Sequence, residues 1–258
     1  MGGFLSLIYG VAAYVFFLGT FLYAIGFIGN LFVPKSIDSG APGPVVEAVI
    51  VNLALLGLFA VQHSVMARRS FKRWWTTMVP PAVERSTYVL AATAALALLL
   101  WQWRPIAEPV IWRVESPLGA GLLWAVFWLG WGILLLATFL INHFELFGLS
   151  QVVARLTGVP LPAQEFRTPF IYRYVRHPIY LGFVLGMWSA PVMTVGHLLF
   201  AVGGTGYILV GIWFEERDLV HHFGDQYRRY RDQVGMLLPW RKSVSDTDLR
   251  NRGQAPIS

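Results

Sequence analysis

Long uninterrupted runs of apolar residues alternate with short polar links along most of the chain. A helix needs roughly 20 consecutive apolar residues to cross a hydrocarbon core about 30 Å thick. The longest runs approach or exceed this length and occupy about residues 5–32, 45–66, 87–103 and 118–141. The pattern therefore predicts four membrane-spanning helices.

The next apolar stretch, residues 179–214, contains Pro191 near its middle. Its first arm, residues 179–190, is shorter than a full span, whereas its second arm, residues 195–214, is long enough to cross. Proline removes a backbone hydrogen-bond donor and ends the helix that precedes it. We therefore expect a late helical hairpin that either crosses and returns or enters from one side only, which brings the total to five or six membrane segments.

The residues after this hairpin have a different periodicity. Between residues 215 and 234, apolar side chains recur every three or four positions, which is the spacing of one helix face. They are Leu219, Phe223, Tyr227, Tyr230 and Val234. We expect one amphipathic C-terminal helix on the cytoplasmic face, followed by a polar, disordered tail over residues 242–258. Residues 1–241 then form a single domain.

The composition supports a membrane location. Hydrophobic residues make up 56% of the 258 residues and charged residues 13%, whereas a soluble domain carries about 25% charged residues. Together with the helical runs, this predicts an all-α integral membrane protein whose surroundings are membrane lipid. The chain has no cysteine, which excludes disulfides, thiolate metal ligands and a cysteine nucleophile.

The net charge of +6 indicates contact with lipid headgroups rather than with nucleic acid. Basic residues gather in the second and fourth links and in the C-terminal part of the chain, and such clusters mark the cytoplasmic side of a membrane protein. We therefore expect a multi-pass protein in which both charged ends of the late hairpin face the cytoplasm.

Two charged clusters bracket the hairpin and carry the candidate chemistry. The first contains Arg176 and His177 directly before Pro178, a residue that favours the first position of a helix. His177 then lies at a helix N-terminus, which attracts anions, and Arg176 is suited to bind a carboxylate. The competing interpretation is a cytoplasmic anchor arginine beside a capping histidine.

The second cluster is the adjacent pair Glu215 and Glu216 at the end of the apolar stretch. A carboxylate near lipid has a high free-energy cost, so an ionisable residue in this position indicates a functional role. If both arms return to one face, one carboxylate can pair with Arg176 and the other can accept hydrogen bonds from ribose hydroxyls. The alternative is a headgroup-level pair that Arg217 neutralises.

Two histidines lie at the ends of predicted spans on the same face. His143 is followed closely by Glu145, and His63 lies near the end of the second run. A histidine whose pKa is near neutral is a natural proton acceptor for a thiol or an amine. For His63 we favour an interhelical hydrogen bond instead. The chain has no HxxxH or HExxH spacing, so we expect no metal site.

The two clusters also belong to a longer motif. Residues 176–182 read RHPIYLG, residues 215–219 read EERDL and residues 223–230 read FGDQYRRY. This combination, within about residues 172–239, resembles the isoprenylcysteine carboxyl methyltransferase-like superfamily of membrane proteins.

The upstream part of the chain carries a second resemblance. Residues 59–68 (FAVQHSVMAR), 139–149 (FLINHFELFGL) and 191–200 (PVMTVGHLLF) are similar to bacterial methanethiol S-methyltransferases. With these segments the likeness extends over nearly the whole chain.

The resemblance implies an enzyme of the bacterial inner (cytoplasmic) membrane that uses S-adenosyl-L-methionine to methylate methanethiol to dimethyl sulfide, with its active site facing the cytoplasm. Carried over position by position, the cofactor-binding residues are Tyr174, Val175, Arg176, His177, Tyr180, Glu215 and Glu216. His143 is the first candidate for taking the thiol proton, with Glu145 or Tyr180 as second choices.

Two other functions stay open from the sequence. One is a methyltransferase of the same fold that acts on a lipid or a prenylated carboxylate. The other is a non-enzymatic membrane protein that binds haem or quinone through His63 and His143.

Overall fold

The computed structural model describes residues 2–41, 43–163 and 165–239 and consists almost entirely of helices. Within these residues, five helices are long and apolar enough to cross a membrane. They are α1 (Gly3–Gly29), α2 (Val45–Ala67), α4 (Pro81–Gln102), α5 (Pro117–Ile141) and α9 (Val195–Phe223). A shorter apolar helix, α8 (Pro178–Trp188), precedes α9. The predicted all-α membrane fold, with four spans and a late helical hairpin, is therefore confirmed.

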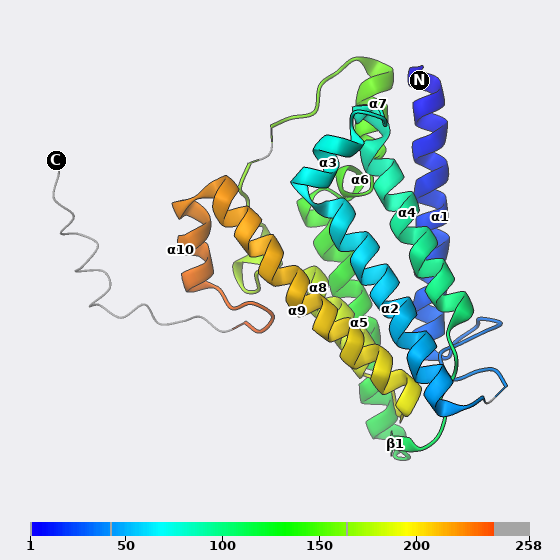
Figure 1. The fold of residues 1–258 in the computed structure, drawn as a ribbon. Coiled ribbons are helices and arrows are strands. Elements are labelled where there is room, and N and C mark those ends of the chain that lie inside the picture. Colours follow the sequence, from blue (N-terminus) through cyan, green and yellow to red (C-terminus); the bar gives the residue numbers. More distant parts are fainter. Residues whose placement is uncertain (1, 42, 164, 240–258) are drawn as a thin grey trace, which may run out of the picture.

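Short helices connect and follow the spans. They are α3 (Arg69–Trp75), α6 (His143–Leu146), α7 (Leu149–Thr157), the 3-10 helix η1 (Phe170–Arg173) and α10 (Asp225–Gln233). The N-terminus, α3, α6 and α7 lie at one end of the bundle and β1 lies at the other, while α9 leads back from the β1 end toward α10 (Figure 1). Both ends of the hairpin therefore lie away from the β1 end.

A two-stranded antiparallel ribbon, which the sequence patterns did not predict, holds the turn of the hairpin. Strand β1 (Val110–Arg113), between α4 and α5, pairs with β2 (Val192–Thr194), between α8 and α9. The Thr194 hydroxyl donates to the carboxylate of Asp38 and accepts a hydrogen bond from the backbone N–H of His197, which caps α9. These bonds anchor the turn, so that the two arms return to the opposite end of the bundle.

Helix α8 lies directly against α5 because both helices carry glycine at the contact. A Cβ atom at Gly182 would lie 2.5 Å from the carbonyl oxygen of Gly130, and a Cβ atom at Gly130 would lie 2.8 Å from the carbonyl oxygen of Gly182. Close to this contact, a Cβ atom at Gly186 would lie 2.8 Å from the indole ring of Trp131. Small residues permit such close approach of membrane helices, and the contact fixes the position of α8.

The prediction of one amphipathic helix over residues 215–234 is wrong. Helix α9 continues through Phe223, and the chain turns at Gly224, whose φ is +56°, before α10 begins. Glycine adopts this conformation without the steric penalty of a Cβ atom, and the apolar spacing on both sides of it hides the break. The two adjacent glutamates therefore lie on the last turns of α9. The predicted disordered tail, residues 242–258, lies outside the described residues.

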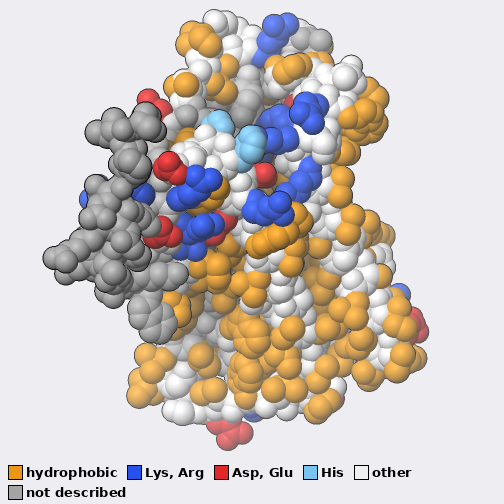
Figure 2. Space-filling view, turned by 60° about the vertical axis from the view of Figure 1, so that its left-hand side comes forward, with side chains coloured by type: hydrophobic (Ala, Val, Ile, Leu, Met, Phe, Trp, Pro, Cys, Tyr) orange, Lys and Arg blue, Asp and Glu red, His pale blue; other side chains and the backbone are white. Residues whose placement is uncertain are grey.

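The spans expose much of their apolar surface. The side chains of Val46 and Leu118 are 72% and 75% exposed, for example. Contiguous apolar surface of this extent is typical of contact with a bilayer. Figure 2 shows a broad apolar area with Lys and Arg side chains gathered along one margin.

Candidate active site

The candidate site forms where the start of α8 meets the last turns of α9. Pro178 begins α8, where its missing N–H removes no helical hydrogen bond. Arg176 and His177 directly precede the helix, and their side chains extend to α9. The Nε atom of Arg176 lies 2.8 Å from Glu216 Oε1, and His177 Nε2 lies 3.1 Å from the same oxygen.

Arg176 and Glu216 form a buried ion pair. Their side chains are 8% and 13% exposed, and a charge that is removed from water needs hydrogen-bond partners as well as a counter-charge. Arg176 has such partners, because its Nη1 atom donates to the carbonyl oxygens of Arg231 (2.8 Å) and Val234. Its Nη2 atom makes no hydrogen bond to any described residue, so this nitrogen is available to a ligand oxygen.

Glu215 projects in a different direction from α9, because consecutive helical residues are about 100° apart around the axis. Its side chain is 44% exposed, and its Oε2 atom lies 3.8 Å from His177 Nδ1. The carboxylate also interacts with the hydroxyl of Tyr180 in the first turn of α8. The two glutamates therefore differ: Glu216 is paired inside the protein, whereas Glu215 lines the accessible side of the site.

The segment after α10 closes over the start of α8. Val175 forms a parallel β-bridge with Gly235. The backbone N–H of Arg176 donates to the carbonyl oxygen of Gly235 (3.0 Å), and that of His177 donates to the carbonyl oxygen of Met236 (3.2 Å). These bonds satisfy backbone donors around a helix start, which lack intrahelical partners. They also hold α10 beside the ion pair.

Aromatic side chains cover the ion pair from the side of α10. The ring centroid of Phe166 lies 5.9 Å from that of Tyr227 and 5.4 Å from that of Tyr230. Tyr227 is 2% exposed. Its buried hydroxyl has no hydrogen-bond partner among the described residues. The charges of Glu216 and Arg176 act on this hydroxyl. Burial raises the pKa of Tyr230 to about 12. A buried hydroxyl without a partner is costly unless a ligand completes its hydrogen bonding.

Tyr227 is a candidate site residue that the sequence reasoning missed. The apolar periodicity placed it on the hydrophobic stripe of a surface helix, where its ring would only pack. The available signal was its position in the segment FGDQYRRY. The two segments that accompany it in the motif, RHPIYLG and EERDL, were already assigned to the site.

Tyr174 and Val175 directly precede the charged cluster. The side chain of Tyr174 is 54% exposed, whereas that of Val175 is 3% exposed. All of the predicted cofactor residues therefore lie at or next to the junction of α8 with α9.

His143 lies in a different environment. Its Nε2 atom is 2.8 Å from the Tyr14 hydroxyl and its Nδ1 atom is 2.8 Å from the Thr138 hydroxyl, while its ring stacks on Phe139 at 4.3 Å. Burial lowers the pKa of His143. Both ring nitrogens thus help to hold α1 to the end of α5, and within the described chain no hydrogen bond or ion pair joins this histidine to the cluster on α8 and α9.

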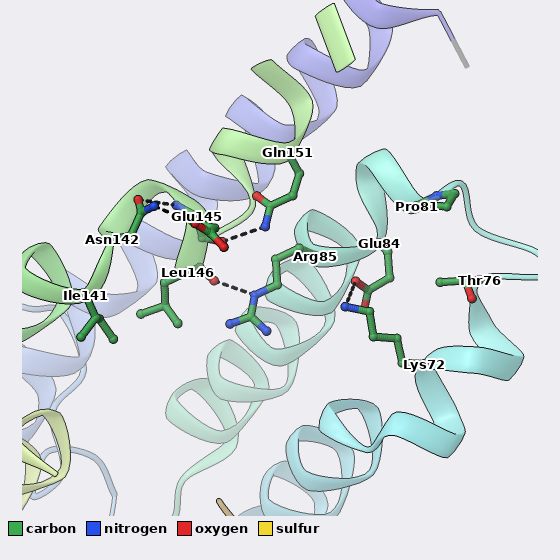
Figure 3. Close-up of a pocket in the computed structure, with 10 residues that line it drawn as sticks. All are labelled: Lys72, Thr76, Pro81, Glu84, Arg85, Ile141, Asn142, Glu145, Leu146 and Gln151. Carbon is green, nitrogen blue, oxygen red and sulfur yellow. Dashed lines mark hydrogen bonds and ion pairs between the residues drawn. The ribbon is translucent and has the colours of Figure 1, made fainter. Parts of the chain in front are cut away.

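Glu145 lines a separate pocket of about 400 Å³ beside α6 (Figure 3). On one side of the pocket, Lys72 and Glu84 form an ion pair of 2.9 Å. On the other side, Arg85 donates to a backbone carbonyl oxygen of α6 (2.7 Å), and Glu145 accepts a hydrogen bond from the side chain of Asn142 (2.7 Å). The described residues that line this pocket include none of the predicted cofactor residues.

The second histidine, His63, is bonded across helices. Its Nε2 atom lies 2.8 Å from the hydroxyl of Tyr88, which joins α2 to α4. The interhelical hydrogen bond that the sequence favoured is therefore confirmed. Each histidine that would have to ligate a haem is already bonded to a protein hydroxyl.

These features define a class of protein: a multi-pass membrane protein whose charged site is built by a late helical hairpin and closed by a C-terminal helix. Comparison with known proteins narrows the class. The chain is 59% identical to the methanethiol S-methyltransferase of Mycobacterium tuberculosis, over 93% of this chain and 98% of that protein. It is 57% identical to methanethiol S-methyltransferase 1 of Bradyrhizobium diazoefficiens, over 93% of this chain and 84% of that protein.

This chain belongs to the methanethiol S-methyltransferase family, which confirms the resemblance seen in its motifs. It is also 30% identical to nurim of Danio rerio, over 69% of this chain and 67% of that protein. No family model matches the chain, and no solved structure matches it.

Proposed function

We propose that this protein transfers a methyl group from S-adenosyl-L-methionine to methanethiol and so forms dimethyl sulfide. Relatives named methanethiol S-methyltransferase, at 59% and 57% identity over 93% of the chain, support the reaction and the acceptor. The observation that supports the methyl donor is the buried pair of Arg176 and Glu216, with Glu215 and the Tyr227 hydroxyl beside it. This arrangement suits a ligand that carries a carboxylate, an ammonium and sugar hydroxyls.

The residues present fit such a donor. The Nη2 atom of Arg176, which has no partner among the described residues, can bind a carboxylate. The Glu215 carboxylate can accept hydrogen bonds from an ammonium or from ribose hydroxyls. The Tyr227 hydroxyl offers one more hydrogen bond, and aromatic faces stabilise a nearby cation. When bound, S-adenosyl-L-methionine supplies a methyl group on a sulfonium, which is a good leaving group.

In this reaction the protein binds and orients the two substrates and excludes water from them. In-line attack needs the thiol sulfur about 3–3.5 Å from the methyl carbon. The thiol loses its proton, its sulfur forms the new carbon–sulfur bond, and the electron pair of the broken bond stays on the departing thioether. Helix α10 and the segment after it cover the site and keep bulk water away from the reacting atoms.

Three residues were candidates from the sequence for taking the thiol proton. Tyr180 adjoins the charged cluster through Glu215. His143 has both ring nitrogens bonded to hydroxyls, and Glu145 lines the separate pocket beside α6. Of the three, Tyr180 is the one that lies beside the cluster that we propose holds the donor, with its ring centroid 5.6 Å from that of His177.

The location that we propose is the bacterial inner membrane, with the site facing the cytoplasm. Basic residues cluster in α3 and at the end of α2, at the end of the bundle opposite β1, and clusters of this kind remain on the cytoplasmic side. A small apolar thiol can reach the site through the bilayer.

The test is headspace detection of dimethyl sulfide from membranes that contain this protein, supplied with methanethiol and S-adenosyl-L-methionine. We expect dimethyl sulfide only when both substrates and the protein are present. Hydrogen sulfide and longer thiols are run in parallel to define the acceptor range. Membranes that bind S-adenosyl-L-methionine but methylate only lipid or a prenylated carboxylate would refute the proposal.

A further inference from the structure

His63 has a buried ring nitrogen that the described part of the fold does not use. Its Nε2 atom is bonded to Tyr88, but its Nδ1 atom is buried and has no hydrogen-bond partner among the described residues. The ring is surrounded by aromatic side chains: its centroid lies 5.4 Å from that of Phe59 and 6.2 Å from that of Tyr207. When Nε2 carries the ring proton and donates it to the Tyr88 oxygen, Nδ1 is an acceptor that can receive a proton or a hydrogen bond from a small ligand.

Open space lies on the face of α9 that carries Tyr207, the residue whose ring lies beside this histidine. Tyr207, Gly211 and Glu215 follow one another at intervals of four residues, so they project from neighbouring parts of one face of the helix. At Gly211, the one described heavy atom within 4 Å of an added Cβ would be the hydroxyl oxygen of Tyr180, at 4.0 Å. Gly203, further toward the start of α9, has no such room, because a Cβ there would lie 2.9 Å from Leu56.

This face of α9 leads from His63 toward the charged cluster. Tyr207, one helical turn before Gly211, lies beside His63. The Tyr180 hydroxyl lies 4.0 Å from the Cβ position of Gly211, and the Tyr180 ring centroid lies 5.6 Å from that of His177 in the cluster. Tyr88 is the residue that holds His63. A ligand beside Gly211 would therefore lie between the histidine and the site proposed for the methyl donor.

We propose that the acceptor thiol binds beside Gly211, between α2, α8 and α9, and that His63 Nδ1 takes its proton. This inference rests on the proposed methyl transfer and assigns the acceptor half of the same site. The S–H proton passes to Nδ1 while the sulfur electron pair forms the bond to the methyl carbon. The neutral imidazole becomes an imidazolium, which returns its proton to solvent as the products leave. His63 is then a catalytic residue, and Gly211 limits the size of the thiol.

The test measures turnover over a range of pH together with binding of S-adenosyl-L-methionine. His63→Gln keeps a side chain that can bond to Tyr88 but removes the basic nitrogen, and His63→Ala removes both. We expect each variant to lose about 100-fold or more of its turnover at neutral pH, since general-base catalysis contributes about 10²- to 10⁴-fold. Cofactor affinity stays within about twofold of wild type, because the cofactor cluster is untouched.

The pH profile separates a base from a structural residue. Among the described residues, the charged or titratable groups that face His63 are Arg85 and Tyr88 on α4 and Tyr207 on α9. All three stay in place in His63→Gln. We expect the deficit of this variant to shrink as pH rises, because thiolate formed in solution then replaces the missing base. A deficit that is the same at every pH would overturn the assignment, as would turnover within threefold of wild type at neutral pH.

Two control variants match these changes. His197 is also buried with an unpartnered Nδ1 atom among the described residues, but it lies at the other end of α9, so we expect His197→Gln to keep the wild-type pH profile. Gly211→Ala adds a methyl group that the fold accommodates. We expect it to lower turnover of ethanethiol relative to methanethiol at least tenfold, whereas Gly206→Ala, where an added Cβ meets no described atom within 4 Å, leaves this ratio unchanged.

Failure of the acceptor-site proposal can be distinguished from failure of the proposed function. An unchanged thiol ratio in Gly211→Ala would overturn the acceptor site while the proposed function stands. Wild-type protein that makes no dimethyl sulfide would overturn both.

Discussion

Replacing Glu216 with glutamine tests the centre of the proposed cofactor site. One carboxylate oxygen of Glu216 accepts from both Arg176 (2.8 Å) and His177 (3.1 Å). Glutamine has the same shape and keeps one acceptor oxygen, but it loses the negative charge. The guanidinium of Arg176, which is 8% exposed, is then left without its counter-charge.

The size of the effect follows from this geometry. Removing one partner of a fully buried ion pair costs about 3–5 kcal/mol, and a hydrogen bond to a charged group contributes about 1.5–3 kcal/mol. The Glu216 side chain is 13% exposed, and the amide oxygen of glutamine can still accept from Arg176. We therefore expect Glu216→Gln to make the free energy of cofactor binding less favourable by about 2 kcal/mol. This corresponds to about 30-fold weaker binding of S-adenosyl-L-methionine.

The assay is isothermal titration of S-adenosyl-L-methionine into purified protein in detergent, with thermal unfolding measured on the same samples. Glu165→Gln is the matched control, because its ion pair with Arg167 is exposed and such pairs contribute about 0–1 kcal/mol. Arg176→Ala should also weaken binding, and its effect should not add to that of Glu216→Gln, since both remove the same contact. Wild-type affinity in Glu216→Gln would show that the cofactor does not depend on this pair.

Three further predictions follow from single contacts. Tyr227→Phe removes a buried hydroxyl that has no partner among the described residues, so we expect about tenfold weaker cofactor binding with no fall in the thermal midpoint; a lower midpoint with unchanged affinity would contradict this. Gly182→Ala places a methyl group 2.5 Å from the carbonyl oxygen of Gly130, and such overpacking costs about 1–3 kcal/mol, which a lower thermal midpoint than that of Gly206→Ala would reveal. Burial lowers the pKa of His143 in the folded protein. The stability that this histidine contributes is therefore complete above its unfolded-state pKa of about 6.5 and is lost as pH falls through the folded-state pKa. Between pH 7 and pH 5, the thermal midpoint of His143→Gln should fall less than that of wild type.

Much of the membrane architecture followed from the sequence alone. The apolar runs predicted the four spans because a helix in lipid must satisfy its backbone internally and present apolar side chains around most of its circumference. Pro191 and the short first arm of the last stretch predicted the hairpin. The motif RHPIYLG with EERDL identified the residues that meet at the junction of α8 and α9, because proline at a helix start and carboxylates at the end of a span are local signals.

Tertiary structure decided what those local signals could not. The break at Gly224 was hidden because the apolar spacing continues across it, and the ribbon of β1 with β2 joins segments that are far apart in the chain. Three features depend on which helices become neighbours. They are the burial of Tyr227, the bonding of His143 to two hydroxyls, and the ring nitrogen of His63 that has no partner in the described part of the chain. A sequence pattern shows which residues can share a helix face, but a hydrogen bond between helices depends on their separation and rotation, and packing contacts such as that of α5 with α8 set both.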